Sequence, residues 1–169
     1  MKRWYAAMCK PLQDERAEHN LAAQGYEVLR PLARVRKRRA GKACTVIESL
    51  FPRYLFIHLD DQSENWAPIR STLGLAGLVR FGGRAVAVPG QLIDAIRRRL
   101  DATTCCVDLT VDDGPRKGAT VRITEGPFAG HEAVFQARSG DERVIVLLQV
   151  MQQTQRLKLP AEAVEYANG

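Results

Sequence analysis

The chain has 169 residues, 46% of them hydrophobic, which suits one large or two small globular domains and excludes a disordered tail. Its net charge of +6 is unevenly spread, because residues 1–100 carry 18 basic and 9 acidic side chains whereas residues 101–169 carry 7 and 10. No apolar run approaches the roughly 20 residues that span a bilayer, and the first residues lack the apolar segment of a signal peptide, so we expect a cytoplasmic protein without membrane contact.

The first hundred residues predict a mixed domain of strands and helices. Apolar runs and alternating patterns predict strands at residues 4–9, 26–32, 54–59, 77–81 and 85–88. The run 54–59 is apolar on both faces, so we place it at the centre of a sheet. Helical spacing and end signals predict helices at residues 14–24, 64–71 and 89–100.

A basic hairpin is predicted between residues 34 and 47, with Gly41 at its tip and residues 44–47 as the return arm. Its outgoing arm and tip carry six cations and no acid: Arg34, Arg36, Lys37, Arg38, Arg39 and Lys42. We consider these residues nucleic-acid-binding candidates, because a row of cations suits a phosphate backbone. A solvated hairpin tip is an equal alternative, since no aromatic side chain is interleaved to stack on bases.

Residues 101–115 lack periodicity and are rich in aspartate, which predicts a linker between a domain at 1–100 and a domain at 116–169. Five short strands are then predicted at 119–124, 131–137, 143–150, 154–159 and 163–166, enough for a small closed barrel.

A helical hairpin is the alternative for the C-terminal part. Val144, Leu147, Leu148 and Met151 lie at helical spacing, although Val144, Val146, Leu148 and Val150 also alternate as in a strand. In the helical form, a first helix begins near Pro127 and ends before Ser139, and Asp141 is the N-cap of the second.

Residues 117–130 have a distinctive pattern: Lys117-Gly118, then Val121 and Ile123, then Gly126-Pro127 and Gly130. The pattern resembles the KOW motif of transcription elongation factors and some ribosomal proteins. An ordinary hairpin in a small barrel is the alternative.

The N-terminal half resembles the NusG family of transcription elongation factors. The resemblance rests on Trp4-Tyr5, Cys9-Lys10, the basic hairpin, the run of residues 50–56 (LFPRYLF), and Gly74 before residues 79–82 (VRFG). Within the family, the specialised antitermination factor RfaH is the most similar. The resemblance implies an α+β fold, with an antiparallel sheet flanked by helices in the N-terminal domain. It also implies a five-stranded SH3-like KOW barrel, or a docked helical hairpin in its place.

The resemblance implies that the N-terminal domain binds the clamp helices of RNA polymerase. The candidate residues form an apolar set that we expect to be exposed: Phe51, Pro52, Tyr54, Phe56, Phe81, Ile93 and Ile96. From the pattern alone, an ordinary core position is the alternative for each of them.

The resemblance also implies contact with non-template DNA through Lys10, Gln24 and Thr72. The chain departs from RfaH at Asn20, Ala23 and Leu73, and Asn65-Trp66-Ala67 replaces its contact to the polymerase gate loop. Glu48 and Arg143, with Phe135, are implied to join the two domains.

The sequence does not favour an enzyme. His19, His58 and His131 lie outside any catalytic pattern, and Gly82-Gly83 lacks the lysine of a phosphate-binding loop. The four cysteines show no metal-binding spacing, so we expect reduced thiols, no metal and no cofactor.

We therefore expect a monomeric factor that suppresses pausing and termination by RNA polymerase and couples transcription to translation. In this hypothesis the KOW domain binds a ribosomal protein or the termination factor Rho. One alternative is a general NusG protein that cooperates with Rho. The other is an RNA-binding module of ribosomal type, which the acidic C-terminal half disfavours.

Overall fold

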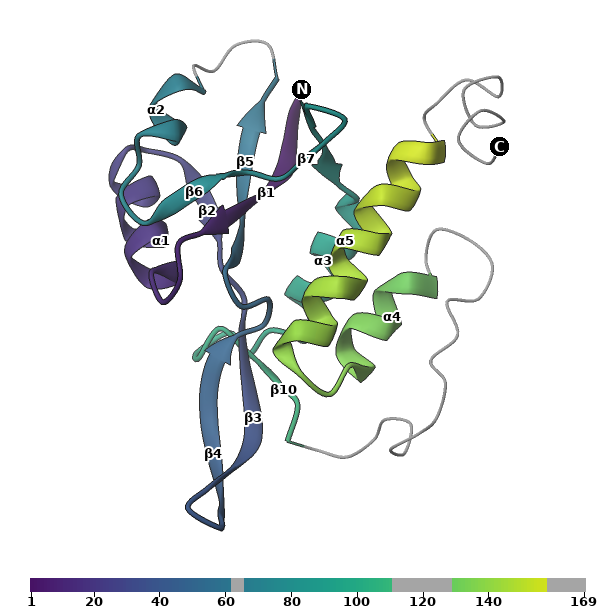
Figure 1. Ribbon diagram of the computed structural model, residues 1–169. Helices are drawn as coiled ribbons and strands as arrows, with labels where there is room; N and C mark the ends of the chain where they lie inside the picture. Colours follow the sequence, from purple (N-terminus) through teal and green to yellow (C-terminus); the bar gives the residue numbers. More distant parts are fainter. Residues whose placement is uncertain (62–65, 111–128, 158–169) are drawn as a thin grey trace.

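The computed structural model describes residues 1–61, 66–110 and 129–157 (Figure 1). A main sheet has the order β2-β5-β1-β6, and β9 also pairs with β1. Its strands are β1 (Lys2–Cys9), β2 (Glu27–Leu29), β5 (Tyr54–Asp60), β6 (Leu75–Leu78) and β9 (Ala87–Val88). All of these pairings are antiparallel. The predicted central place of residues 54–59 is confirmed, because β5 lies between two strands and its Leu55, Phe56 and Ile57 are fully buried.

Helices cover both faces of this sheet, as the two-residue period of the strands requires. On one face, Ala17 and Leu21 of α1 (Asp14–Ala23) pack with Leu55 and Ile57. On the other face, α3 (Gly90–Arg99) packs its apolar side against Phe56. The short helix α2 (Ala67–Arg70) follows β5. Gly74 is required where its loop meets α1, because its φ is +92° and a Cβ would lie 2.9 Å from the backbone nitrogen of Ala17.

A second sheet contains the basic hairpin and has the order β10-β3-β4, in which β10 spans Cys106–Asp108. The hairpin consists of β3 (Leu32–Arg39) and β4 (Lys42–Ser49). They are joined at Ala40-Gly41, where both residues have a positive φ. The predicted strand at 26–32 is interrupted before Leu32, since Pro31 lacks an N–H group and the chain passes there from one sheet to the other. Glycines 82 and 83 join the short strands β7 (Arg80–Phe81) and β8 (Arg84–Ala85).

The predicted linker begins with regular structure. β10 (Cys106–Asp108) pairs in parallel with the first residues of β3. Asp101 stabilises the turn that precedes β10, because the carboxylate of Asp101 accepts hydrogen bonds from the backbone N–H groups of Thr103 and Thr104. Three residues are too few to show a periodic pattern, so the sequence did not predict this strand.

Within its described residues, the C-terminal part is helical. α4 (Ala129–Gln136) and α5 (Gly140–Leu157) pack against each other and against the α3 face of the N-terminal domain (Figure 1). The predicted strands at 131–137 and 143–150 are therefore wrong, and residues 154–157 are helical as well. The predicted strands at 119–124 and 163–166 and most of the KOW-like motif lie outside the described residues.

The helical alternative accounts for these observations. Leu147 and Met151 are fully buried on the helical stripe, and Val144 packs beside them. The predicted end of the first helix before Ser139 is confirmed, since α4 ends at Gln136. Its predicted start near Pro127 lies outside the described residues. Asp141 is not the N-cap. That position belongs to Ser139, whose hydroxyl accepts a hydrogen bond from the N–H of Glu142 at 3.1 Å.

The four cysteines have free thiols in this structure. Cys9 is fully buried in β1, and this burial raises the pKa of its thiol to about 12. It is therefore a core residue without thiolate chemistry at neutral pH.

Candidate functional site

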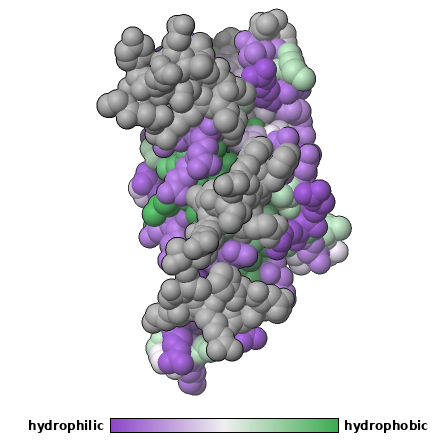
Figure 2. All heavy atoms as spheres, turned by 90° about the vertical axis from the view of Figure 1, so that its right-hand side faces the viewer, coloured by the Kyte–Doolittle hydropathy of each residue, from purple (hydrophilic) through white to green (hydrophobic). Residues whose placement is uncertain are grey.

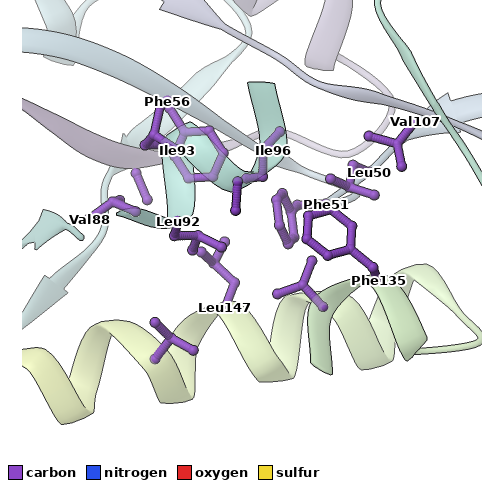
Figure 3. Close-up of a cluster of buried hydrophobic side chains, with 14 of the residues drawn as sticks. Leu50, Phe51, Phe56, Val88, Leu92, Ile93, Ile96, Val107, Phe135 and Leu147 are labelled. Atoms are coloured by element: carbon purple, nitrogen blue, oxygen red, sulfur yellow. The ribbon is translucent and has the colours of Figure 1, made fainter. Parts of the chain in front are cut away.

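The apolar set chosen from the sequence forms one continuous face that α4 and α5 cover. Phe51 and Phe56 meet edge to face, with 5.6 Å between ring centroids. Ile93 and Ile96 of α3 complete the centre of this face (Figure 3). Tyr54 and Phe81 are half-buried at its margin, and Pro52 lies beside the α4–α5 turn.

The C-terminal helices supply the other half of this core. Phe135 of α4 lies against Phe51, and Leu147 of α5 points toward Leu92 (Figure 3). Val134, Val150 and Met151 bury their side chains in the same cluster. The expected exposure of the face is therefore wrong for this conformation, because four of its seven residues are at most 1% exposed. Viewed from the side of α4 and α5, the coloured surface is mostly hydrophilic, with small apolar patches (Figure 2).

A buried ion pair joins the two parts of the chain. Arg143 of α5 is only 1% exposed, and its Nη2 lies 3.0 Å from Oε1 of Glu48 in β4. Its Nε donates to the carbonyl of Leu50 at 2.6 Å. The other carboxylate oxygen of Glu48 accepts a hydrogen bond from Lys37 at 2.5 Å. Burial lowers the pKa of Arg143, and Glu48 opposes that effect. We call Glu48, Arg143 and Leu50 the latch.

Phe135, the third predicted interdomain residue, has a polar partner as well as an apolar one. The guanidinium carbon of Arg99, at the end of α3, lies 4.0 Å from the centre of its ring. Such cation–π contacts contribute roughly 0.5–2 kcal/mol. The structure thus brings Glu48, Arg143 and Phe135 together at one boundary.

Gly140, which the sequence did not mark as a site residue, sets how closely the α4–α5 turn approaches Pro52. A Cβ on Gly140 would lie 2.4 Å from Cγ of Pro52. The signal available in the sequence was Ser139-Gly140-Asp141-Glu142, an N-terminal pattern with a small residue in its first turn.

We expect Gly140→Ala to loosen the docked helices by about 1–3 kcal/mol, the usual cost of overpacking. Hydrogen–deuterium exchange of the α5 amides should accelerate accordingly. In Pro52→Ala/Gly140→Ala the obstructing ring atoms are gone, so exchange should return toward that of Pro52→Ala alone. Acceleration of equal size on both backgrounds would show that the contact with Pro52 is not the cause.

The basic hairpin presents its cations on two faces. Arg34, Arg36 and Arg38 alternate along the exposed face of β3. Lys37 lies on the opposite face, where it binds Glu48 of the latch. Arg39 and Lys42 pair at the exposed tip. The hairpin therefore has one arginine face that remains open while the C-terminal helices are docked.

The second set of nucleic-acid-binding candidates, Lys10, Gln24 and Thr72, lies around one loop. Nε2 of Gln24 donates to the hydroxyl of Thr72 at 2.9 Å and to the carbonyl of Asn20 at 3.0 Å. The backbone of Lys10 joins the same loop by a hydrogen bond to Gly74 at 2.8 Å. Thr72 is 6% exposed, so its hydroxyl serves this network, and Leu73 is the exposed side chain of the loop.

Comparisons with known proteins agree on one family. The family model described as "Transcription termination factor nusG" matches residues 2–97. The chain belongs to the NusG family.

The curated relatives of this chain include NusG proteins from several bacteria. The NusG of Thermus thermophilus is 33% identical over 147 residues, which cover 75% of this chain and 77% of that protein. The NusG of Staphylococcus epidermidis is 28% identical over 156 residues, 87% of this chain and 85% of its own length. A solved structure on domain interaction in Thermotoga maritima NusG is matched with a TM-score of 0.43 and 23% identity, over 58% of this chain and 56% of that one.

NusG membership defines the general activity of the chain. These relatives are named transcription termination/antitermination proteins, and the family consists of non-enzymatic factors that bind RNA polymerase. The matched proteins are NusG rather than RfaH specifically. In the ranges 1–61, 66–110 and 129–157, no group of three or more metal-ligating side chains occurs. None of the helices described there has the length and apolar character to cross a membrane.

Proposed function

We propose that this NusG-family factor binds the clamp helices of RNA polymerase through the apolar face that α4 and α5 cover. The observation that carries the proposal is the composition of this face: two phenylalanines and two isoleucines at its centre, with Tyr54 and Phe81 at its margin. Buried aromatic anchors of this kind dominate protein interfaces. By bridging the polymerase cleft, the factor favours the closed clamp over the open one and makes pausing less populated.

In this proposal the docked helices regulate binding. Polymerase and the C-terminal helices compete for the same side chains, so the apparent affinity falls in proportion to the open fraction. Release of the latch is then the step that admits the polymerase.

The general NusG function has the support of the curated relatives, which are named transcription termination/antitermination proteins, and Rho is the partner that we propose for it. A second candidate, the specialised antitermination function of the RfaH type, is supported by one observation: the docked helical form of the C-terminal residues. Mapping the transcripts lost on deletion of the protein separates the two. Loss confined to a few long operons supports specialisation, and genome-wide effects support the general function.

Other partners follow from the same proposal. The C-terminal part binds Rho or a ribosomal protein once it is free, and the factor acts as a monomer in the cytoplasm beside the polymerase. A ribosomal-type RNA-binding module has little support, because the family match covers the N-terminal half rather than the KOW-like segment.

We further propose that the arginine face of the hairpin follows duplex DNA, while the surface formed by Lys10, Gln24 and Thr72 contacts the non-template strand, with Thr72 holding the side chain of Gln24. Alternate residues of a strand lie about 6.6–6.8 Å apart, and each DNA strand presents a phosphate every ~3.4 Å along the axis. The arginine row therefore offers cations at a spacing of the same order as that of the phosphates of a DNA backbone.

Removal of two of these charges should change the salt dependence of DNA binding. For Arg36→Ala/Arg38→Ala we expect the slope of log K against log salt to become shallower by about 1.8, the loss of two phosphate contacts on duplex DNA. Fluorescence anisotropy of a labelled duplex measures this slope. Arg84→Ala/Arg98→Ala removes two exposed charges outside the hairpin and should leave the slope nearly unchanged. Equal slopes for the two double variants would exclude the hairpin as the contact.

Binding to isolated clamp helices tests the polymerase proposal itself. The full-length chain should bind the clamp helices weakly. A variant in which the latch is broken, such as Glu48→Ala, should bind them far more tightly. If the opened variant also fails to bind, the apolar face is not the polymerase-binding surface.

A further inference from the structure

A cavity of about 600 Å³ lies between α2, β6 and β7. α2 and β6 lie on the side of the molecule away from α4 and α5 (Figure 1). Docking of the C-terminal helices therefore leaves this cavity accessible. Neither the apolar face nor the basic hairpin contributes to it.

The cavity combines an aromatic wall, an apolar floor and two cations. Trp66 forms part of the wall, and Ile69 and Leu78 contribute apolar surface. Arg70 and Arg80 are exposed and also line the cavity. A flat aromatic ring beside guanidinium groups is the combination with which proteins hold an unpaired base and its phosphates.

The indole ring of Trp66 is fixed before any ligand arrives. Its Nε1–H donates to the carbonyl of Asp60 at 3.0 Å. Tyr5, which is 5% exposed, packs against it at an interplanar angle of 66°, with 4.9 Å between ring centroids. Because the N–H is already used, the ring offers stacking rather than hydrogen bonding. A preorganised ring loses little rotamer freedom when a base stacks on it.

The local charge favours an anionic ligand. The nearby carboxylates of Asp60 and Asp61 are each paired with the α-amino group of Met1, at 3.4 and 3.6 Å. Arg80, which lines the cavity, donates a hydrogen bond from its Nη1 to the carbonyl of Gly83 at 3.3 Å. An acidic peptide would satisfy the two arginines but would make no particular use of the indole ring.

We propose that this cavity binds one nucleotide of a single-stranded nucleic acid, with the base stacked on Trp66 and its flanking phosphates on Arg70 and Arg80. The placement extends the nucleic-acid contact proposed above and rests on that part of the proposed function. α2 connects the two sites, since the N–H of Thr72 bonds to the carbonyl of Ile69 at 3.2 Å. A strand that leaves Thr72 and Gln24 can therefore continue across α2 into the cavity.

The two tryptophans of the chain allow a local test in the full-length protein. In Trp4→Phe, Trp66 is the only tryptophan, and the ring stacked on His58 is replaced by a smaller ring. Titration with oligo(dT) should quench its fluorescence to saturation. In Trp66→Phe, the buried Trp4 should report no change. The wild-type protein, with both tryptophans, should show the same saturable quenching at smaller amplitude.

Charge variants extend the test. Arg70→Ala and Arg80→Ala should each weaken oligonucleotide quenching several-fold and make its salt slope shallower by about 0.7, the value for one phosphate contact on a single strand. Arg98→Ala removes an exposed charge that does not line the cavity and should have no effect.

Several results would overturn the proposal. One is unchanged Trp66 fluorescence at oligonucleotide concentrations where anisotropy shows the protein to be saturated. A second is quenching by a poly-glutamate peptide but not by oligo(dT), which would assign the cavity to an acidic protein segment. A third is equally tight binding of thymidine monophosphate, which would assign it to a free nucleotide. None of these readouts depends on the clamp helices, so failure here is distinct from failure of polymerase binding.

Discussion

Glu48→Ala should release α4 and α5 more completely than Arg143→Ala. Removing Glu48 leaves the guanidinium of Arg143 buried without its counter-ion, a situation that costs about 3–5 kcal/mol. Removing Arg143 leaves Glu48 paired with Lys37. The carbonyl of Leu50 then loses its hydrogen bond from Arg143, which costs about 1–3 kcal/mol. Because opening returns Arg143 to water, both penalties appear as release of the helices rather than unfolding of the N-terminal domain.

Hydrogen–deuterium exchange of the α5 amides measures this difference, with Gln149→Ala as an exposed control on the same helix. The reciprocal exchange Glu48→Arg/Arg143→Glu should restore little, since the new arginine would face Lys37 and the new glutamate cannot donate to Leu50. Equal exchange rates in the two alanine variants, or full recovery in the exchanged pair, would contradict the latch geometry described above.

Substitutions on the two sides of the covered face should have opposite effects on binding to the clamp helices. Phe135→Ala deletes a ring from the covering helix, together with its contact to Arg99. A loss of about 3 kcal/mol in docking would raise the apparent affinity by up to ~100-fold, until the open form predominates. The side chains that meet the polymerase remain intact.

Tyr54→Ala should weaken binding by about 2 kcal/mol, or roughly 30-fold, as for a lost aromatic anchor. Tyr54 is half-buried, and its hydroxyl has only a weak contact, 3.7 Å from the sulfur of Met8, so the domain should remain folded. The comparison is best made in the Glu48→Ala background, where docking no longer competes. Unchanged affinity of a folded Tyr54→Ala variant in that background would remove Tyr54 from the interface.

Most of the N-terminal fold could be predicted from the sequence, because its elements have strong and distinct periods. The run 54–59 is apolar on both faces and forms the interior strand β5, and the spacing of Leu92, Ile93 and Ile96 predicts α3. The short strand β10 escaped prediction because its order comes from pairing with β3 rather than from a pattern of its own.

The C-terminal conformation was undetermined for a different reason. Residues 144–151 satisfy the strand period and the helical period at once, so local pattern does not choose between them. The choice depends on the N-terminal face, which accepts Leu147 and Met151 from one side of a helix. For the same reason the residue pattern alone indicated the apolar face, whereas its cover was implied only by the family resemblance. Both the helical form of the C-terminal residues and the burial of the apolar face depend on contacts between segments that are distant in the sequence.

The covering of the apolar face by α4 and α5 also affects whether the chain self-associates before it binds a partner. Without α4 and α5, Phe51, Phe56, Ile93 and Ile96 would lie at the surface together with Leu92. Contiguous apolar surface beyond a few hundred Å² promotes self-association. Because α4 and α5 belong to the same chain as the apolar face, they can cover it at any protein concentration. A truncated chain without these helices should therefore self-associate at concentrations where the intact protein stays monodisperse.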